Sequence, residues 1–239
     1  MEKNPKVKGV LTAALNIVSI ILLGLVLQIG GAYLVNAAVN IMGELDEASS
    51  VASAALQYND FMEYIRTIEP KQFANVIFVA PLIEEIVFRL IFLRAGKIVL
   101  PFWAANLIQA ALFGLYHTVT IQRVYGFVIG LVIGCVFYYC PLIYRSRCVE
   151  DAGKSLRGKE GGLSSVPDSL IGVATTFLLH VVINAAGIFI APLLPADLPY
   201  SLQIIIGSVF MLIAFAAAYA LYVISRKGNN TNYHAEVAG

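Results

Sequence analysis

Residues 72–93 read QFANVIFVAPLIEEIVFRLIFL. A bilayer-spanning helix needs about 20 mostly apolar residues, so this run is long enough to cross a membrane. It nevertheless contains Glu84, Glu85 and Arg89. A charged side chain at the centre of a membrane helix costs about 2.5 to 3.5 kcal/mol on insertion scales and has to be offset by pairing or by function. The stretch therefore predicts a membrane helix that carries a polar site.

The composition of the whole chain supports a membrane protein. Of its 239 residues, 59% are hydrophobic and 13% are charged, whereas soluble domains carry about 25% charged residues. This low charge excludes a water-soluble fold and a disordered chain. A formal net charge of +1 also argues against a nucleic-acid partner held by a basic surface. The expected surroundings are a lipid bilayer.

Six apolar segments are long enough to span it, which predicts an all-α, polytopic protein of one membrane domain over residues 1–239. Their dense Leu, Ile, Val, Ala and Gly content favours helices over the alternating strands of a barrel. The predicted spans are 10–41, 72–93, 98–122, 124–144, 169–191 and 202–224.

Basic residues predict the orientation, because Lys and Arg are disfavoured in short external loops. Twelve of them fall on one side of the six spans, against Arg66, Lys71 and Arg123 on the other. Both termini are thus expected in the cytoplasm of a multi-pass protein of the cell membrane. A Gly-, Ser- and charge-rich stretch, residues 145–168, is expected to be a flexible cytoplasmic loop. In residues 43–71, apolar side chains at helical spacing predict an amphipathic helix on the outer leaflet.

The ionisable residues inside the spans gather on three helices, which predicts one shared cavity. Span two carries the two glutamates and Arg89, span three carries His117, and span five carries His180 with Asn184. Glu85 and Arg89 are four residues apart, so they stack on one helix face as a clamp. The reactive cluster is then Glu84, His117, His180 and Asn184.

Two chemistries suit this cluster. A carboxylate beside imidazoles can act as a general base on water, while an amide or imidazole N–H stabilises an oxyanion. Alternatively, Glu84, His117 and His180 could ligate a zinc ion that keeps an open position for water. The residues alone leave both open, so the expected cofactor is none, or zinc as the alternative.

The predicted spans place Glu84, His117 and His180 at different depths in the membrane. At 1.5 Å per residue, Glu84 and His180 lie about 17 to 18 Å from the outer ends of their spans. His117 lies only about 8 Å from the end of a span that runs to Gln122. Span three is therefore expected to be tilted, to start deeper or to extend further.

Three motifs follow one another on these spans: EExxxR at residues 84–89, FxxxH at residues 113–117, and HxxxN at residues 180–184. Together they resemble the CAAX prenyl protease and bacteriocin-processing (CPBP, or Abi) family of intramembrane endopeptidases. The resemblance covers residues 72–191, the predicted catalytic core.

The resemblance implies a role for each matched residue. Glu84 and His117 would activate the attacking water, and His180 and Asn184 would stabilise the oxyanion. Glu85, Arg89 and Phe113 would support them. The substrate would be a membrane-associated protein or peptide, and the mechanism would be metal-free and glutamate-dependent, with a metalloprotease as the alternative.

Two other functions fit the same pattern. One is a non-catalytic membrane scaffold or bacteriocin-immunity protein with the same fold. The other is a small proton-coupled carrier that uses Glu84 and the histidines as a relay. The chain lacks an inverted repeat, which argues against the carrier.

Overall fold

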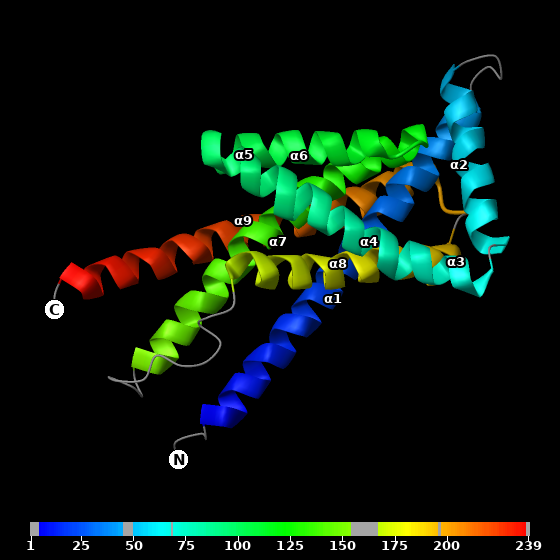
Figure 1. The fold of residues 1–239 in the computed structure, drawn as a ribbon. Coiled ribbons are helices and arrows are strands. Elements are labelled where there is room, and N and C mark those ends of the chain that lie inside the picture. Colours follow the sequence, from blue (N-terminus) through cyan, green and yellow to red (C-terminus); the bar gives the residue numbers. More distant parts are fainter. Residues whose placement is uncertain (1–4, 45–49, 68, 154–166, 196, 238–239) are drawn as a thin grey trace.

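The computed structural model describes residues 5–44, 50–67, 69–153, 167–195 and 197–237, and every regular element in these ranges is a helix (Figure 1). No strand occurs among them, which confirms the all-α class. The elements are α1 (Pro5–Gly43), α2 (Ser50–Thr67), α3 (Pro70–Ala74), η1 (Asn75–Val79), α4 (Ala80–Glu84), η2 (Glu85–Leu93), α5 (Arg94–Val99), α6 (Phe102–Tyr116), α7 (Thr120–Gly153), α8 (Asp168–Phe189), η4 (Ala191–Leu193) and α9 (Tyr200–Val237).

Four stretches in the described ranges are long and apolar enough to cross a membrane: Ala13–Met42, Thr120–Tyr144, Asp168–Leu193 and Tyr200–Arg226. They match predicted spans one, four, five and six to within a few residues. The protein is therefore a helical membrane protein. The position of its termini relative to the bilayer stays a prediction.

The predicted second span is helical but changes its winding twice. Two π-helical segments, η1 and η2, alternate with the short helices α3 and α4. Pro81, at the start of α4, has no N–H to donate to the preceding turn, so a regular α-helix cannot pass through this point. The segment that carries both glutamates is thus a helix that alternates between α and π winding. π turns of this kind occur often at functional sites.

The predicted third span is wrong in its extent. Residues 98–122 are divided between the end of α5, the helix α6 and the start of α7. Helix α6 has 15 residues and is about 22 Å long, shorter than a hydrocarbon core of about 30 Å. The turn that follows it, which begins at His117, can therefore lie at membrane depth. This shortening resolves the mismatch in depth between His117 and the other motif residues.

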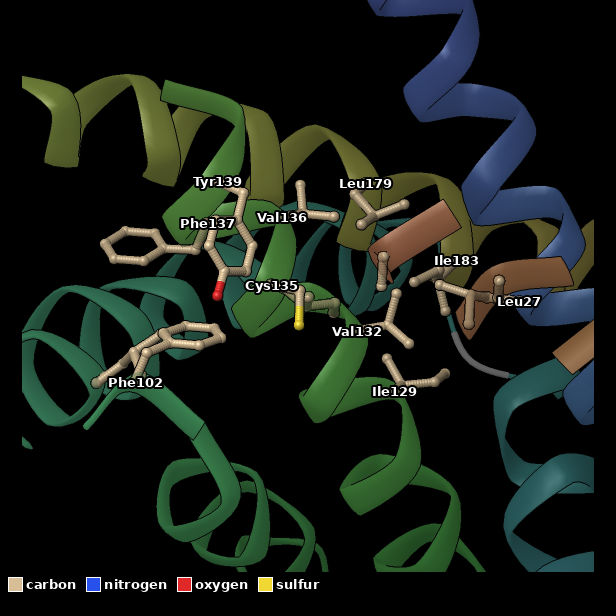
Figure 2. Close-up of a cluster of buried hydrophobic side chains, with 14 of the residues drawn as sticks. Leu27, Phe102, Ile129, Val132, Cys135, Val136, Phe137, Tyr139, Leu179 and Ile183 are labelled. Atoms are coloured by element: carbon tan, nitrogen blue, oxygen red, sulfur yellow. The ribbon is translucent and has the colours of Figure 1, made fainter. Parts of the chain in front are cut away.

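Helix α7 is the centre of the bundle, packed against α6, α8 and α9. Figure 2 shows Val132, Cys135 and Val136 of α7 between Phe102 of α6 on one side and Leu179 of α8 on the other. Glycines let the helices approach: a Cβ at Gly130 would lie 3.2 Å from the Cα of Ala110. Close packing through small residues is the usual adhesive between membrane helices.

Helix α2 runs across the end of the bundle at which α6 turns into α7 (Figure 1). It packs against α1 and α7, and Phe61, Met62 and Ile65 line a cavity of the bundle. The predicted amphipathic helix is therefore present. Ile65 is buried against protein, whereas Leu56 and Tyr64 are exposed, and the position of the helix on the outer leaflet stays a prediction.

The predicted loop begins later than residue 145. Helix α7 continues to Gly153, so residues 145–153 are helical, because the polar residues after Tyr144 extend the helix beyond its apolar part. The rest of the predicted loop, residues 154–166, lies outside the described residues.

Candidate active site

The two adjacent glutamates lie at the junction of α4 and η2. Glu85 Oε2 is 3.3 Å from Nε of Arg89, and neither side chain is exposed at all. Glu84 is partly accessible, with 12% of its side chain exposed. Burial of a charged pair is tolerated only when the charges compensate one another. The predicted ion pair between Glu85 and Arg89 is thus present, and Glu84 is the carboxylate with access to open space.

His180 of α8 joins both carboxylates. Its Nδ1 is 2.9 Å from Glu85 Oε1, and its Nε2 is 3.5 Å from Glu84 Oε2. The sequence predicted that Glu85 belongs to a separate clamp, but this contact connects the clamp directly to the reactive cluster. Two carboxylates and one guanidinium leave one surplus negative charge. An imidazole protonated on both nitrogens would balance it, with a hydrogen bond from Nδ1 to Glu85 and an ion-pair contact between Nε2 and Glu84.

Asn184, one turn further along α8, holds the irregular helix in place. Its Nδ2 donates to the backbone carbonyl of Val76, 2.9 Å away. The N–H of Ala80 bonds to the carbonyl of Asn75 instead, and Pro81, five residues after Val76, has no N–H to offer. Asn184 therefore supplies the hydrogen bond that the π-helical winding and the proline withhold from Val76. One amide hydrogen of Asn184 is left for another acceptor.

His117 caps the C-terminus of α6. Its Nδ1 is 2.8 Å from the carbonyl oxygen of Phe113. A carbonyl only accepts, so Nδ1 carries the proton in this contact, and in the neutral imidazole Nε2 keeps a lone pair. The imidazole thus presents a hydrogen-bond acceptor away from its own helix.

Two residues of α7 fix the turn that carries His117. Arg123 donates from Nε to the carbonyl of His117 at 2.8 Å and from Nη2 to that of Thr118 at 3.3 Å. Gly126 lies directly behind the ring, where an added Cβ would be 3.3 Å from Nδ1 and Cε1. Cations that bond the last carbonyls of a helix stabilise its end. Sequence reasoning counted Arg123 only among the basic residues outside the cytoplasm and assigned no role in the site to Gly126.

Phe113 lies at the centre of the buried residues. The guanidinium of Arg89 is 4.3 Å from the centroid of its ring. The same ring meets the imidazoles of His117 and His180 edge-on, at centroid distances of 5.0 and 5.8 Å. A cation over an aromatic face is attracted by the ring quadrupole. Phe113 therefore packs the clamp against both histidines, in keeping with its predicted supporting role.

A cavity of about 990 Å³ opens beside these residues. All four residues predicted to be catalytic line it: Glu84, His117, His180 and Asn184. Glu85, Arg89 and Phe113 are fully or almost fully buried behind it. The opposite wall comes from α1 and α2, where sequence reasoning placed no functional residue.

The zinc alternative, with Glu84, His117 and His180 as ligands, stays a prediction. Among the described residues, no three His, Cys, Asp or Glu side chains are grouped closely enough to hold a metal ion. Both ring nitrogens of His180 face carboxylates, and Nδ1 of His117 faces a backbone carbonyl. A zinc ligand needs a ring nitrogen whose lone pair is free. Nε2 of His117 meets this condition, whereas His180 meets it only if one of its two contacts with the carboxylates is given up.

Comparison with known proteins identifies the segment that carries the first two motifs. Residues 68–146 match the family of Rce1-like type II CAAX prenyl endopeptidases. This match confirms the resemblance to CAAX proteases that the motifs predicted, and it supports an intramembrane protease. The Rce1-like segment contains the glutamates, Arg89 and His117, whereas His180 and Asn184 follow it. No curated protein and no solved structure matches the chain.

Proposed function

We propose that the protein is an intramembrane endopeptidase that hydrolyses a peptide bond of a membrane-associated protein or peptide. The observation that carries this proposal is that Glu84, His117, His180 and Asn184, from three separate helices, line one cavity. The first two lie in the Rce1-like segment. Residues 72–191 would be the catalytic core of a single membrane domain, placed in the cell membrane.

Glu84 and His117 would activate water. The Glu84 carboxylate and the lone pair on His117 Nε2 are both acceptors, so together they can hold the two hydrogens of one water molecule. That arrangement leaves an oxygen lone pair free to attack a carbonyl carbon. The water oxygen bonds to this carbon, one proton passes to Glu84, and Glu84 later delivers it to the departing amine. The peptide C–N bond breaks and leaves a new carboxyl and a new amino terminus.

His180 and Asn184 would hold the oxyanion. When Glu84 takes up the proton from water, it loses its negative charge and its attraction for Nε2 of His180. The Nε2–H is then available for the developing oxyanion, together with the second amide hydrogen of Asn184. Removal of one such donor from an oxyanion hole costs about 10² to 10³ in kcat in a well-studied case.

Glu85, Arg89 and Phe113 would support this chemistry without touching the substrate. Glu85 fixes the ring of His180 through Nδ1, and Arg89 compensates the buried charge of Glu85. The reaction proposed here uses no metal ion.

The experiment is a cleavage assay of the full chain in proteoliposomes, with a library of peptides that do or do not carry a lipidated cysteine. In water enriched in ¹⁸O, wild type is expected to give products whose new carboxyl group contains the label. His117→Ala should lose this activity, and His234→Ala, which replaces the histidine outside the three motifs, should keep it. Absence of any product from wild type would contradict the proposal and favour a non-catalytic scaffold.

A further inference from the structure

Helix α1 contributes a polar pair to the wall of the cavity. The hydroxyl of Tyr125, on α7, donates to Oε1 of Gln28, on α1, over 2.6 Å. Both residues line the cavity. An amide inside an apolar span needs hydrogen-bond partners, because an unsatisfied polar group in a low-dielectric environment is costly.

Two glycines make room for this pair. A Cβ at Gly31 would lie 2.0 Å from Cε2 of Tyr125, so the phenol reaches Gln28 only because position 31 has no side chain. A Cβ at Gly187, on α8, would lie 3.1 Å from Nε2 of Gln28. The amide thus lies in a slot between α7 and α8.

The hydrogen bond from Tyr125 leaves the amide nitrogen of Gln28 unused. Oε1 accepts from the hydroxyl, and among the described residues Nε2 donates to none. Another amide of the wall, that of Asn36, is engaged differently, since its Nδ2 donates to Oε1 of Gln203 at 2.9 Å. The Gln28 nitrogen is therefore a donor held at a fixed place on the cavity surface.

The position of this donor relates to the proposed chemistry. Gly187 is three residues after Asn184 and seven after His180, so it lies about 4.5 and 10.5 Å from them along the axis of α8. An extended peptide advances about 3.3 Å per residue. A peptide bound in extended form along α8, with its scissile carbonyl near His180, would place the carbonyl about three residues away beside Gln28.

We infer that Gln28 is a substrate-binding residue whose amide Nε2–H donates to a backbone carbonyl of the peptide about three residues from the scissile bond, with Tyr125 orienting that amide. This inference rests on the proposed peptidase function. It assigns to α1, outside the Rce1-like segment, the task of setting the register of the peptide.

The test pairs enzyme variants with altered substrates. The probe is the best-cleaved peptide from the library, prepared as a series in which one carbonyl at a time becomes a thioamide, a weaker hydrogen-bond acceptor that keeps the N–H. For wild type in proteoliposomes, kcat/KM is expected to fall about tenfold with the thioamide near the third residue from the scissile bond. Gln28→Ala should lower kcat/KM for the parent peptide about tenfold, mainly through KM.

The deciding result is the coupling between the two changes. With the thioamide at that one position, kcat/KM of Gln28→Ala should equal its value for the parent peptide. With the thioamide at any other position, kcat/KM of Gln28→Ala should fall by the same factor as that of wild type. If Gln28→Ala folds poorly, Gln28→Met replaces it, because methionine keeps the length of the side chain. Gln28→Met should show the same loss of kcat/KM and the same coupling. Gln57→Ala is the matched control, because Gln57 is exposed on α2 and does not line the cavity.

Two failures are distinguishable. If wild type cleaves the peptide and Gln28→Ala and Gln28→Met match it within twofold, or if thioamide effects add at every position, Gln28 does not bind the substrate. If wild type cleaves no peptide, the proposed function fails and the inference falls with it.

Discussion

The ring of His117 rests on Gly126: a Cβ at position 126 would lie 3.3 Å from its Nδ1 and Cε1. This distance is tighter than ordinary van der Waals contact, so any larger residue has to move the imidazole or the turn that carries it. Gly126 thereby connects the packing of α6 against α7 with the orientation of a proposed catalytic group.

Gly126→Ala is therefore expected to lower kcat by tenfold or more, because a small displacement of a catalytic group has large effects on rate, while the yield of folded protein stays near that of wild type. Kinetics and folded yield in detergent measure the two effects. Gly134→Ala is the matched variant, for which the loss is expected in the yield of folded protein and not in kcat per folded molecule. There, a Cβ would lie 1.8 Å from Oδ1 of Asn106. Equal kcat of Gly126→Ala and wild type would refute the positioning role.

Asn184 is expected to have a structural and a catalytic part that can be separated. Asn184→Ala should lose both stability and activity, since Val76 then has no donor. In the background of Pro81→Ala, residue 81 regains an N–H that can reach the Val76 carbonyl. Thermal unfolding should show that Asn184→Ala costs less stability in this background, with kcat still reduced about 10²-fold relative to Pro81→Ala. Recovery of kcat together with stability would show that Asn184 acts only through the helix.

The amides of α6 are expected to be purely structural. Asn106 donates to the carbonyl of Leu131 at 3.0 Å, and Gln109 donates to Oδ1 of Asn106 at 2.8 Å and to the carbonyl of Gly130 at 2.9 Å. Asn106→Leu should lower the free energy of unfolding by about 1 kcal/mol, with kcat per folded molecule within twofold of wild type. A tenfold loss of kcat at normal stability would instead connect this network to the active site.

Cleavage is expected to resist metal chelators. Incubation with 1,10-phenanthroline, followed by removal of the chelator, should leave the cleavage rate within twofold of that of untreated protein. Elemental analysis of the purified protein should find less than one zinc per ten chains. Loss of cleavage that added zinc restores would contradict this and return Glu84, His117 and His180 to the role of metal ligands.

The sequence predicted the helical membrane fold and one side of the cavity, with Glu84, His117, His180 and Asn184, from one physical argument, the cost of burying charge in lipid. That argument locates Glu84, Glu85 and Arg89 because their charges stand out in an apolar run. It also locates the histidines and Asn184, which repeat at helical spacing.

The argument misses features that depend on winding and on neutral groups. The sequence-based prediction assumed a uniform α-helix over residues 72–93. That assumption hides the π-helical turn before Pro81 and the hydrogen bond from Asn184 to the carbonyl of Val76. It also cannot show that both glutamates reach one histidine.

Gln28 was not predicted because the argument from charge considers only ionisable groups and the amide of a motif. Gln28 is one of four side-chain amides in the predicted span 10–41, with Asn16, Asn36 and Asn40, and such amides are the signal that points to this wall of the cavity. The only sequence signal for the short helix α6 is Pro101, which directly precedes its first residue.

The most direct test of the account compares Glu84→Gln with Glu85→Gln. Both changes remove one carboxylate, but only Glu84 lines the cavity, whereas Glu85 is completely buried against Arg89. Glu84→Gln is expected to fold with the yield of wild type and to lose cleavage by at least 10³-fold. Glu85→Gln should mainly lose folded yield, because it leaves a buried guanidinium without its counter-ion. Full cleavage by Glu84→Gln would contradict the proposal that this carboxylate activates the water.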